Sequence, residues 1–369
     1  MRVLGSQPFV SWRRVRRCAA LLLAVLSLAA APAARSADRG PDDDYWQGYI
    51  SAVLERDLGW PRGTYEVEVR QGIATIVLYV DDPERREAAE RALAPIDALH
   101  QVRVIVSGGG KPGGDVPIIF PVGDLFRPLV ADPKQPQFFI SFIEADTPTG
   151  HITGASVGYG ENFGLWRWPG VRPGDGWQLN FTGGLFAQFN LDAPSSDLIN
   201  ADYNVGFVLT HRRGSYSARF RLYHQSSHLG DEFLLGQPNI QRINLSFEAV
   251  DAMLSHEWDR WRVYGGLGYM IHRDPEELEP GYAELGAEYR GQRFRWDLGR
   301  MIGGIHLRSS EELDWDVAVS AKVGIELGQA DPGRRRVRLM AEYYNGPSPF
   351  GQFFDTDIEY VGVGVYFGF

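Results

Sequence analysis

DWDVAVSAKVGIEL, residues 314–327, alternates large apolar side chains with polar or small ones along its whole length. Every second residue from Trp315 to Leu327 is apolar, and the other series includes Lys322 and Glu326. Side chains of a β-strand point alternately to the two faces of its sheet. This stretch is therefore predicted to be a strand with one apolar face and one charged face.

The same alternation recurs through the rest of the C-terminal part of the chain and predicts twelve antiparallel strands. Twelve is an even number, as expected for a bacterial outer-membrane barrel, in which the apolar faces contact lipid. The expected strands span residues 138–145, 151–166, 177–190, 198–211, 216–227, 241–255, 260–272, 281–290, 292–302, 314–327, 335–345 and 357–369.

Four features favour a membrane barrel over a soluble β-sandwich. Many strands have ten or more residues, and long connections alternate with short ones in a way that puts both barrel termini in the periplasm. The chain also ends in Gly364–Phe369, which resembles the C-terminal strand of bacterial outer-membrane proteins. Aromatic residues near strand ends suit an interfacial girdle, and they include Trp177, Trp261, Trp315, Tyr343 and Tyr366.

Residues 1–37 have the pattern of a secretory signal peptide. A basic front precedes an apolar run from Cys18 to Ala31, which is too short to cross a membrane as a helix. Loss of residues 1–37, with six Arg and no acid, changes the formal charge from -10 to -16. Such an acidic exported chain is a poor candidate for binding nucleic acid.

Residues 42–106 predict a small α+β domain ordered helix, strand, strand, helix, strand. This order, with Gly72 before the second strand and Val102-x-Val104 at the end, resembles a BON domain. Ala98 departs from the family, which usually has Gly near that place. The resemblance implies a periplasmic attachment module that binds phospholipid or envelope proteins, and a spacer without a ligand is the alternative.

Residues 107–137 form a Gly- and Pro-rich linker that leads to the barrel of residues 138–369. Ser107–Gly114 is predicted to be a flexible joint. Phe120–Gln137, together with the motif His-x-Ser-Ser-His-Leu-Gly-Asp-Glu at residues 224–232, resembles a family of uncharacterised bacterial outer-membrane proteins, defined only as a domain of unknown function. The resemblance implies a location and no established activity.

His224 and Ser226 are the candidate catalytic pair. The parity of the fifth strand turns Phe220 and Leu222 to lipid, so the side chains of His224 and Ser226 should share that surface. A neighbouring His can accept the proton of a Ser hydroxyl and make it a nucleophile. The pair is similar to the His-x-Ser of outer-membrane phospholipase A and of the outer-membrane lipid A deacylase, which attack lipid esters from the outer wall of a barrel.

A third residue should orient the imidazole of His224. In the next strand, the parity that turns Leu245 and Phe247 to lipid also gives Asn239, which is the candidate. Both of those enzyme families follow His-x-Ser with Asn, whereas this chain has Ser227. The similarity is therefore one of geometry alone.

Other interpretations of this region stay open. The residues could simply hydrogen-bond a loop mouth in a structural or binding barrel. His228, Asp231 and Glu232 could instead hold zinc together with His224, or a divalent cation such as calcium through the carboxylates. A small channel is a further alternative, although charged residues predicted to face the lumen, including Arg219, Arg221 and Glu248, favour a packed salt-bridge interior.

Overall fold

The computed structural model describes residues 43–60, 64–70, 73–78, 82–96, 99–106, 117–170, 174–237, 240, 242–294, 299–328 and 336–368. The expected signal peptide and the joint Ser107–Gly114 lie outside the described residues. None of the helices in the described ranges is long and apolar enough to cross a membrane.

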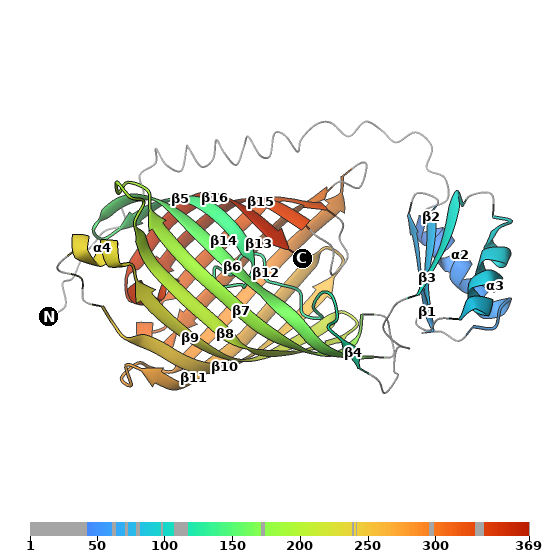
Figure 1. Ribbon diagram of the computed structural model, residues 1–369, viewed down its shortest axis with the longest axis horizontal. Coiled ribbons are helices and arrows are strands. Elements are labelled where there is room, and N and C mark those ends of the chain that lie inside the picture. Colours follow the sequence, from blue (N-terminus) through green and yellow to red (C-terminus); the bar gives the residue numbers. More distant parts are fainter. Residues whose placement is uncertain are drawn as a thin grey trace. The chain divides into compact units, whose positions relative to one another are not determined.

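The N-terminal domain has the expected order of elements. A three-stranded sheet, ordered β1-β2-β3, pairs β1 with β2 antiparallel and β2 with β3 parallel (Figure 1). The side chain of Asp82 accepts a hydrogen bond from the backbone N–H of Arg85 at 3.1 Å and caps the second helix. The elements are α2 (Asp43–Arg56), β1 (Tyr65–Arg70), β2 (Ile73–Leu78), α3 (Pro83–Leu93) and β3 (Gln101–Val106).

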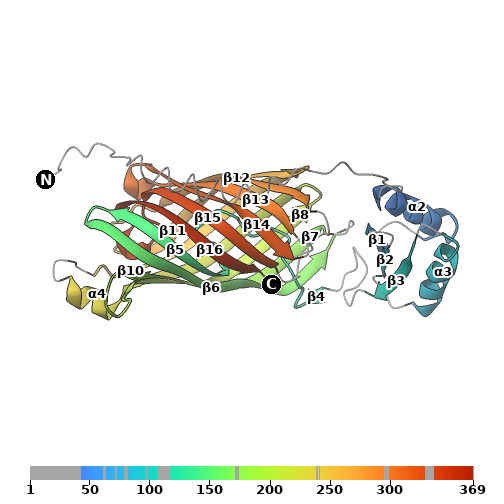
Figure 2. The same cartoon turned by 90° about the horizontal axis from the view of Figure 1, so that it is seen from above.

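The C-terminal part is a closed barrel of twelve antiparallel strands, which confirms the predicted fold class (Figures 1 and 2). The barrel closes because the last strand, β16, pairs with the first, β5. A short strand, β4 (Ile118–Ile119), pairs with β6. The barrel strands are β5 (Phe138–Thr147), β6 (Gly150–Pro169), β7 (Gly176–Asn190), β8 (Leu198–Arg213), β9 (Tyr216–Leu229), β10 (Leu245–Trp258), β11 (Trp261–Asp274), β12 (Gly281–Arg293), β13 (Gly299–Ser310), β14 (Val317–Gly328), β15 (Arg336–Pro347) and β16 (Asp357–Gly368).

The predicted alternation is confirmed in most strands. In β14, Lys322 and Glu326 are buried in the lumen, while Val317 and Leu327 are exposed on the outer face. Apolar side chains dominate the outer face, where Leu254 is 68% exposed and Leu267 70% exposed.

The prediction is wrong for the ninth strand and for Tyr366. The ninth strand is Gly299–Ser310 and not 292–302, so the expected long loop from Gly303 to Leu313 is mostly strand. Tyr366 does not belong to an outer girdle, because it is buried inside the barrel and stacks on Phe139.

A plug, residues 121–137, lies inside the barrel. Its centre is fully buried, and its backbone is bonded to side chains of the barrel wall. The N–H of Val130 donates to Glu288 at 2.8 Å, and Ser320 donates to the carbonyl of Ala131 at 2.6 Å. Part of the segment predicted as linker is therefore built into the lumen.

Ion pairs fill much of the remaining interior. Arg221 lies 2.6 Å from Asp251, and Arg262 lies 3.3 Å from Glu288. Arg262 also donates to the carbonyl of Arg127 at 2.9 Å, which ties the plug to this network. The packed salt-bridge interior that the sequence favours is present, and the plug adds backbone to it.

Candidate functional site

The last residues of β9 alternate between the lumen and the outer face, and the side chains of His224, Ser226 and His228 point outward. Their neighbours Tyr223 and Ser227 point into the lumen and are buried, and alternation along the strand fixes the opposite direction for the other three. The predicted placement of His224 and Ser226 on the outer face is therefore what the structure has.

A carboxylate lies directly across from His224. Glu248 of β10 is the cross-strand partner of His224, and His272 of β11 is the partner of Glu248 on the other side. Nδ1 of His224 lies 2.8 Å from one carboxylate oxygen, and Nδ1 of His272 lies 2.7 Å from the other. Because a carboxylate only accepts, each Nδ1 carries the proton, and Nε2 of each ring is left to accept a proton from another group.

Ser226 lies two residues along β9 from His224, on the same surface. Cβ atoms two residues apart on a strand are separated by about 7 Å, so the imidazole can lean along the strand toward the hydroxyl. Within the described residues, the Ser226 hydroxyl has no side-chain hydrogen bond, whereas Ser227 donates to Asn200 at 3.0 Å and to Asp202 inside the barrel. Of these two hydroxyls, that of Ser226 is therefore the one without a side-chain partner among the described residues.

The prediction of the facing strand is wrong in its parity. Leu245 and Phe247 were expected to face lipid, but both are buried inside the barrel, and Phe247 packs on Tyr223. Glu248, expected in the lumen, consequently faces outward. Asn239, the expected third residue, lies outside the described residues, and Glu248 is the residue that contacts His224.

The signal that could have identified Glu248 is the exposed series Val250, Ala252 and Leu254 on β10. That series has the same parity as Glu248, but the inner series is just as mixed, since it combines Leu245, Phe247 and Met253 with Asp251.

The residues considered for a metal do not come together. His228 is exposed, where its Nδ1 lies 3.3 Å from Arg242 and its ring packs edge-on against Tyr203. Asp231 and Glu232 are exposed in the first turn of the short helix α4 (Asp231–Gly236). Among the described residues, no group of three or more His, Cys, Asp or Glu side chains could hold a metal ion.

An apolar groove on the outer face adjoins the polar group. It extends over β7 to β11 and is lined by side chains that include Phe207, Phe220, Leu222, Val250 and Leu267. Leu222 is two residues from His224, and Val250 is two residues from Glu248, so the groove begins where the polar group ends. The small side chain of Ala252 forms part of its floor.

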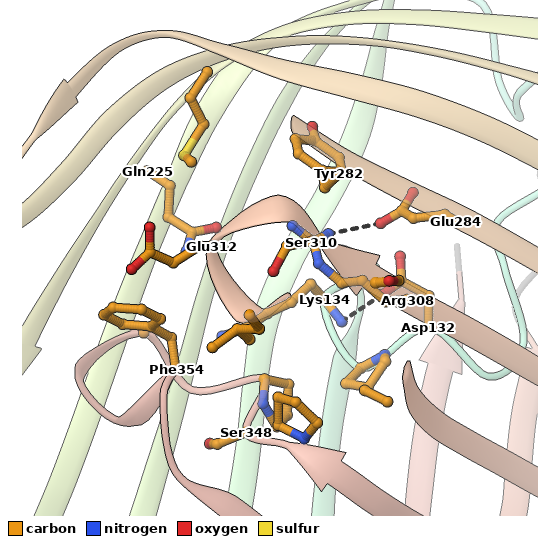
Figure 3. Close-up of a pocket in the computed structure, with 18 of the residues that line it drawn as sticks. Asp132, Lys134, Gln225, Tyr282, Glu284, Arg308, Ser310, Glu312, Ser348 and Phe354 are labelled. Carbon is orange, nitrogen blue, oxygen red and sulfur yellow. Dashed lines mark hydrogen bonds and ion pairs between the residues drawn. The ribbon is translucent and has the colours of Figure 1, made fainter. Parts of the chain in front are cut away.

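The lumen holds a separate cavity of about 150 Å³ beside the plug (Figure 3). Its walls carry charges of both signs, and on one wall Arg308 lies 2.7 Å from its cross-strand neighbour Glu284. Lys134 and Asp132 come from the plug, and Lys134 forms an ion pair with Asp202 of β8. These paired charges belong to the packed interior and are on the opposite side of the wall from Ser226.

A closed barrel with an apolar outer face and a charged, plugged lumen has the fold of an outer-membrane β-barrel protein. The chain belongs to the family described as "Protein of unknown function (DUF1207)", whose model matches residues 116–369. Membership of a family defined only as a domain of unknown function is therefore confirmed.

Comparison with solved structures finds similar barrels at low identity. Outer membrane phospholipase A from Escherichia coli is 14% identical, with 63% of this chain and 91% of that chain covered and a TM-score of 0.44. LpxR from Salmonella typhimurium is 12% identical over 63% of this chain and 100% of that chain, with a TM-score of 0.33. KdgM porin is 10% identical over 63% and 99%, with a TM-score of 0.31. No curated protein matches the sequence.

Proposed function

We propose that the protein spans the bacterial outer membrane and hydrolyses an ester bond of an outer-leaflet lipid. Ser226 is the nucleophile, His224 the general base and Glu248 the residue that orients the imidazole. The observation that carries this proposal is the 2.8 Å contact between Nδ1 of His224 and Glu248 on the surface that Ser226 shares. A nucleophile, a base and a carboxylate in this order are the parts of a serine hydrolase.

The orientation of the barrel follows from its connections. The connections 214–215 and 259–260 are short, whereas those at the other end, such as 230–244 and 348–356, are long. Bacterial outer-membrane barrels have short periplasmic turns and long extracellular loops. These lengths support an orientation in which the Ser226 end of β9 faces the cell exterior, at the level of the outer leaflet.

Ester hydrolysis at this site takes two steps, acylation and deacylation of Ser226, and His224 carries the proton in both. The Ser226 oxygen attacks the ester carbonyl carbon while its proton passes to Nε2 of His224, and Glu248 stabilises the imidazolium that forms. His224 then gives the proton to the departing alcohol, which leaves an acyl-Ser226. A water molecule, deprotonated by His224, attacks the acyl carbon, and the fatty acid departs as Ser226 regains its proton.

The groove supports a lipid as the substrate. Its apolar walls lie next to the polar group and on the membrane side of it, so an acyl chain lying in the groove would bring its ester to Ser226. Calcium, considered for Asp231 and Glu232, has no ligand cluster among the described residues, and the proposed steps do not depend on it. The effect of calcium is tested by adding a chelator to the assay.

The test is release of fatty acid from phospholipid or lipid A by the purified, folded protein with calcium. Ser226→Ala and His224→Ala should each lower turnover by about 10²-fold or more. Ser246→Ala is the matched control, because Ser246 pairs with Ser226 across β9 and β10 and shares its outer face. Release that is absent in the wild type, or equal in Ser226→Ala, would contradict the proposal.

A second candidate, a structural or binding barrel, is supported by the filled lumen. The plug is hydrogen-bonded to Glu288 and Ser320 and occupies the lumen, where the charged side chains of the wall pair with one another. In that case the N-terminal domain, which we propose to be a BON-like periplasmic module, attaches the barrel to phospholipid or to envelope proteins. Its helix, strand, strand, helix, strand order supports this assignment.

A further inference from the structure

An arginine-lined cavity of about 330 Å³ lies at the end of the lumen opposite to Ser226, where β5 begins and β16 ends. The plug forms one wall with Asp124 and Arg127, and the barrel forms the other. The barrel wall carries four guanidinium groups, those of Arg290, Arg300, Arg336 and Arg338.

One carboxylate serves most of these cations. Arg300 donates twice to one oxygen of Glu326, at 2.9 and 2.7 Å, and Arg338 donates to the other oxygen at 2.8 Å. Arg290 lies 3.6 Å from the same carboxylate and 3.6 Å from that of Glu288, which Arg262 also contacts. Arg336 has no ion-pair partner among the described residues. The barrel wall of the cavity therefore carries an excess of positive charge.

The two acids that also line the cavity do not neutralise this excess. The Asp124 carboxylate already accepts hydrogen bonds from Thr210 at 3.0 Å and from Asn162 at 3.2 Å. Glu161 makes no ion pair within the ranges that the structure describes. Asp124 belongs to the plug and Glu161 to β6, whereas the four guanidinium groups are on β12, β13 and β15.

Several buried donors of this cavity lack an acceptor. Arg290 is only 8% exposed, yet its Nε and Nη2 have no hydrogen-bond partner among the described residues, and the same holds for Nη2 of Arg338 and Nε of Arg336. A buried polar group without a partner destabilises a fold. Phosphate supplies several acceptor oxygens and negative charge, and its geometry matches the fork of a guanidinium group.

We propose that this cavity binds a phosphate group, with Arg290 and Arg336 as the main ligands and Arg300 and Arg338 held in place by Glu326. The phosphate group belongs either to a small anion or to the headgroup of an inner-leaflet lipid. Because the plug supplies one wall, the bound group also holds the plug against β12 and β15. The site is independent of Ser226, which lies on the outer face at the opposite end of the barrel.

The test is calorimetric titration of the full chain, folded in a phosphate-free maltoside detergent. One arm adds inorganic phosphate or pyrophosphate, and the other adds phosphatidic acid in mixed micelles, with diacylglycerol as the uncharged comparison. Arg336→Gln should weaken binding at least tenfold without loss of the folded band in an unboiled gel, because Arg336 makes no ion pair with a described residue. Arg290→Gln should weaken it similarly.

Arg213→Gln is the matched control, because Arg213 is exposed at the same end of the barrel and outside the cavity. It should bind as the wild type does. Binding of phosphate or pyrophosphate that Arg336→Gln weakens supports a soluble ligand, and binding of phosphatidic acid alone with the same loss supports a headgroup. The proposal is overturned if the wild type binds neither ligand, or if both Arg variants bind as tightly as the wild type.

Discussion

At the scale of single residues, the outer wall carries a group whose chemistry differs from its surroundings. Charged and polar side chains on a lipid-facing surface are unfavourable, and those that persist there commonly mark function. His224 and Glu248 are each 39% exposed, and they satisfy one another by a hydrogen bond. Ser226, on the same outer face, has no side-chain hydrogen bond within the described residues, so its hydroxyl is available to donate to Nε2 of His224.

Glu248→Gln should lower kcat by about 10²-fold with little change in KM. The amide can still accept a hydrogen bond from Nδ1 of His224, but it has no charge to stabilise the imidazolium in the transition state. His272→Gln is the comparison, because it removes the other partner of the same carboxylate while leaving the His224 contact in place. Steady-state kinetics on a lipid ester measure both variants, and equal kcat in Glu248→Gln and the wild type would refute the role of Glu248.

At the scale of elements, the positions of the strands are easier to predict from the sequence than which side chains of each strand point to the lumen. The polar series of β14 includes Lys322 and Glu326, so only one face could meet lipid. In β10, both series mix apolar residues with acidic ones, including Asp251 in the inner series and Glu248 in the outer series. Hydropathy therefore cannot choose between the two faces, and the prediction turns Glu248 to the wrong one.

The ninth strand was misplaced for a different physical reason. Gly303 and Gly304 interrupt the apolar series of β13, and Ser309 and Ser310 at its end have the composition of a loop. Glycine suits a turn as readily as a strand, so the sequence alone did not favour either. The sequence also does not reveal the plug, because a Pro-rich segment without periodicity is typical of an exposed linker.

The groove predicts a dependence on acyl-chain length. Ala252→Trp should fill the groove and lower turnover of a long-chain phospholipid about tenfold, while hydrolysis of a short, water-soluble ester stays unchanged. Ala341→Trp is the matched control, since Ala341 lies outward on β15, away from the groove. Vesicle and soluble assays run in parallel measure the ratio, and an equal loss on both esters would contradict an acyl-chain role for the groove.

The plug predicts a closed lumen. The intact protein should give no steady conductance in planar bilayers, whereas deletion of residues 121–134 should open a conducting path. The deletion removes Val130 and Ala131, whose backbone groups bond to the wall. The unboiled gel band confirms that the deletion variant has folded. Equal conductance of the intact and deleted proteins would show that the plug does not close the barrel.

At the scale of the whole molecule, the N-terminal domain has a core of its own. Ile50, Leu54, Ile76 and Leu93 are fully buried against one another. Residues 38–106 expressed alone should therefore unfold cooperatively in urea. Ile76→Ala should lower the free energy of unfolding by about 2–4 kcal/mol, because it leaves a cavity in this core.

Ile105→Ala is the control for that domain, because Ile105 is half exposed and its replacement should change the free energy of unfolding by less than about 0.5 kcal/mol. A fragment that shows no cooperative transition would mean that the domain depends on the rest of the chain.

The central claim is that His224 activates Ser226 on the outer wall, and covalent labelling tests it without knowledge of the lipid. The folded protein is treated with a fluorophosphonate, which reacts with activated serines, and the modified peptide is identified by mass spectrometry. We predict an adduct on Ser226 in the wild type, none on Ser246, and loss of the adduct in His224→Ala. An unlabelled Ser226, or labelling that is equal in the wild type and His224→Ala, would contradict the account.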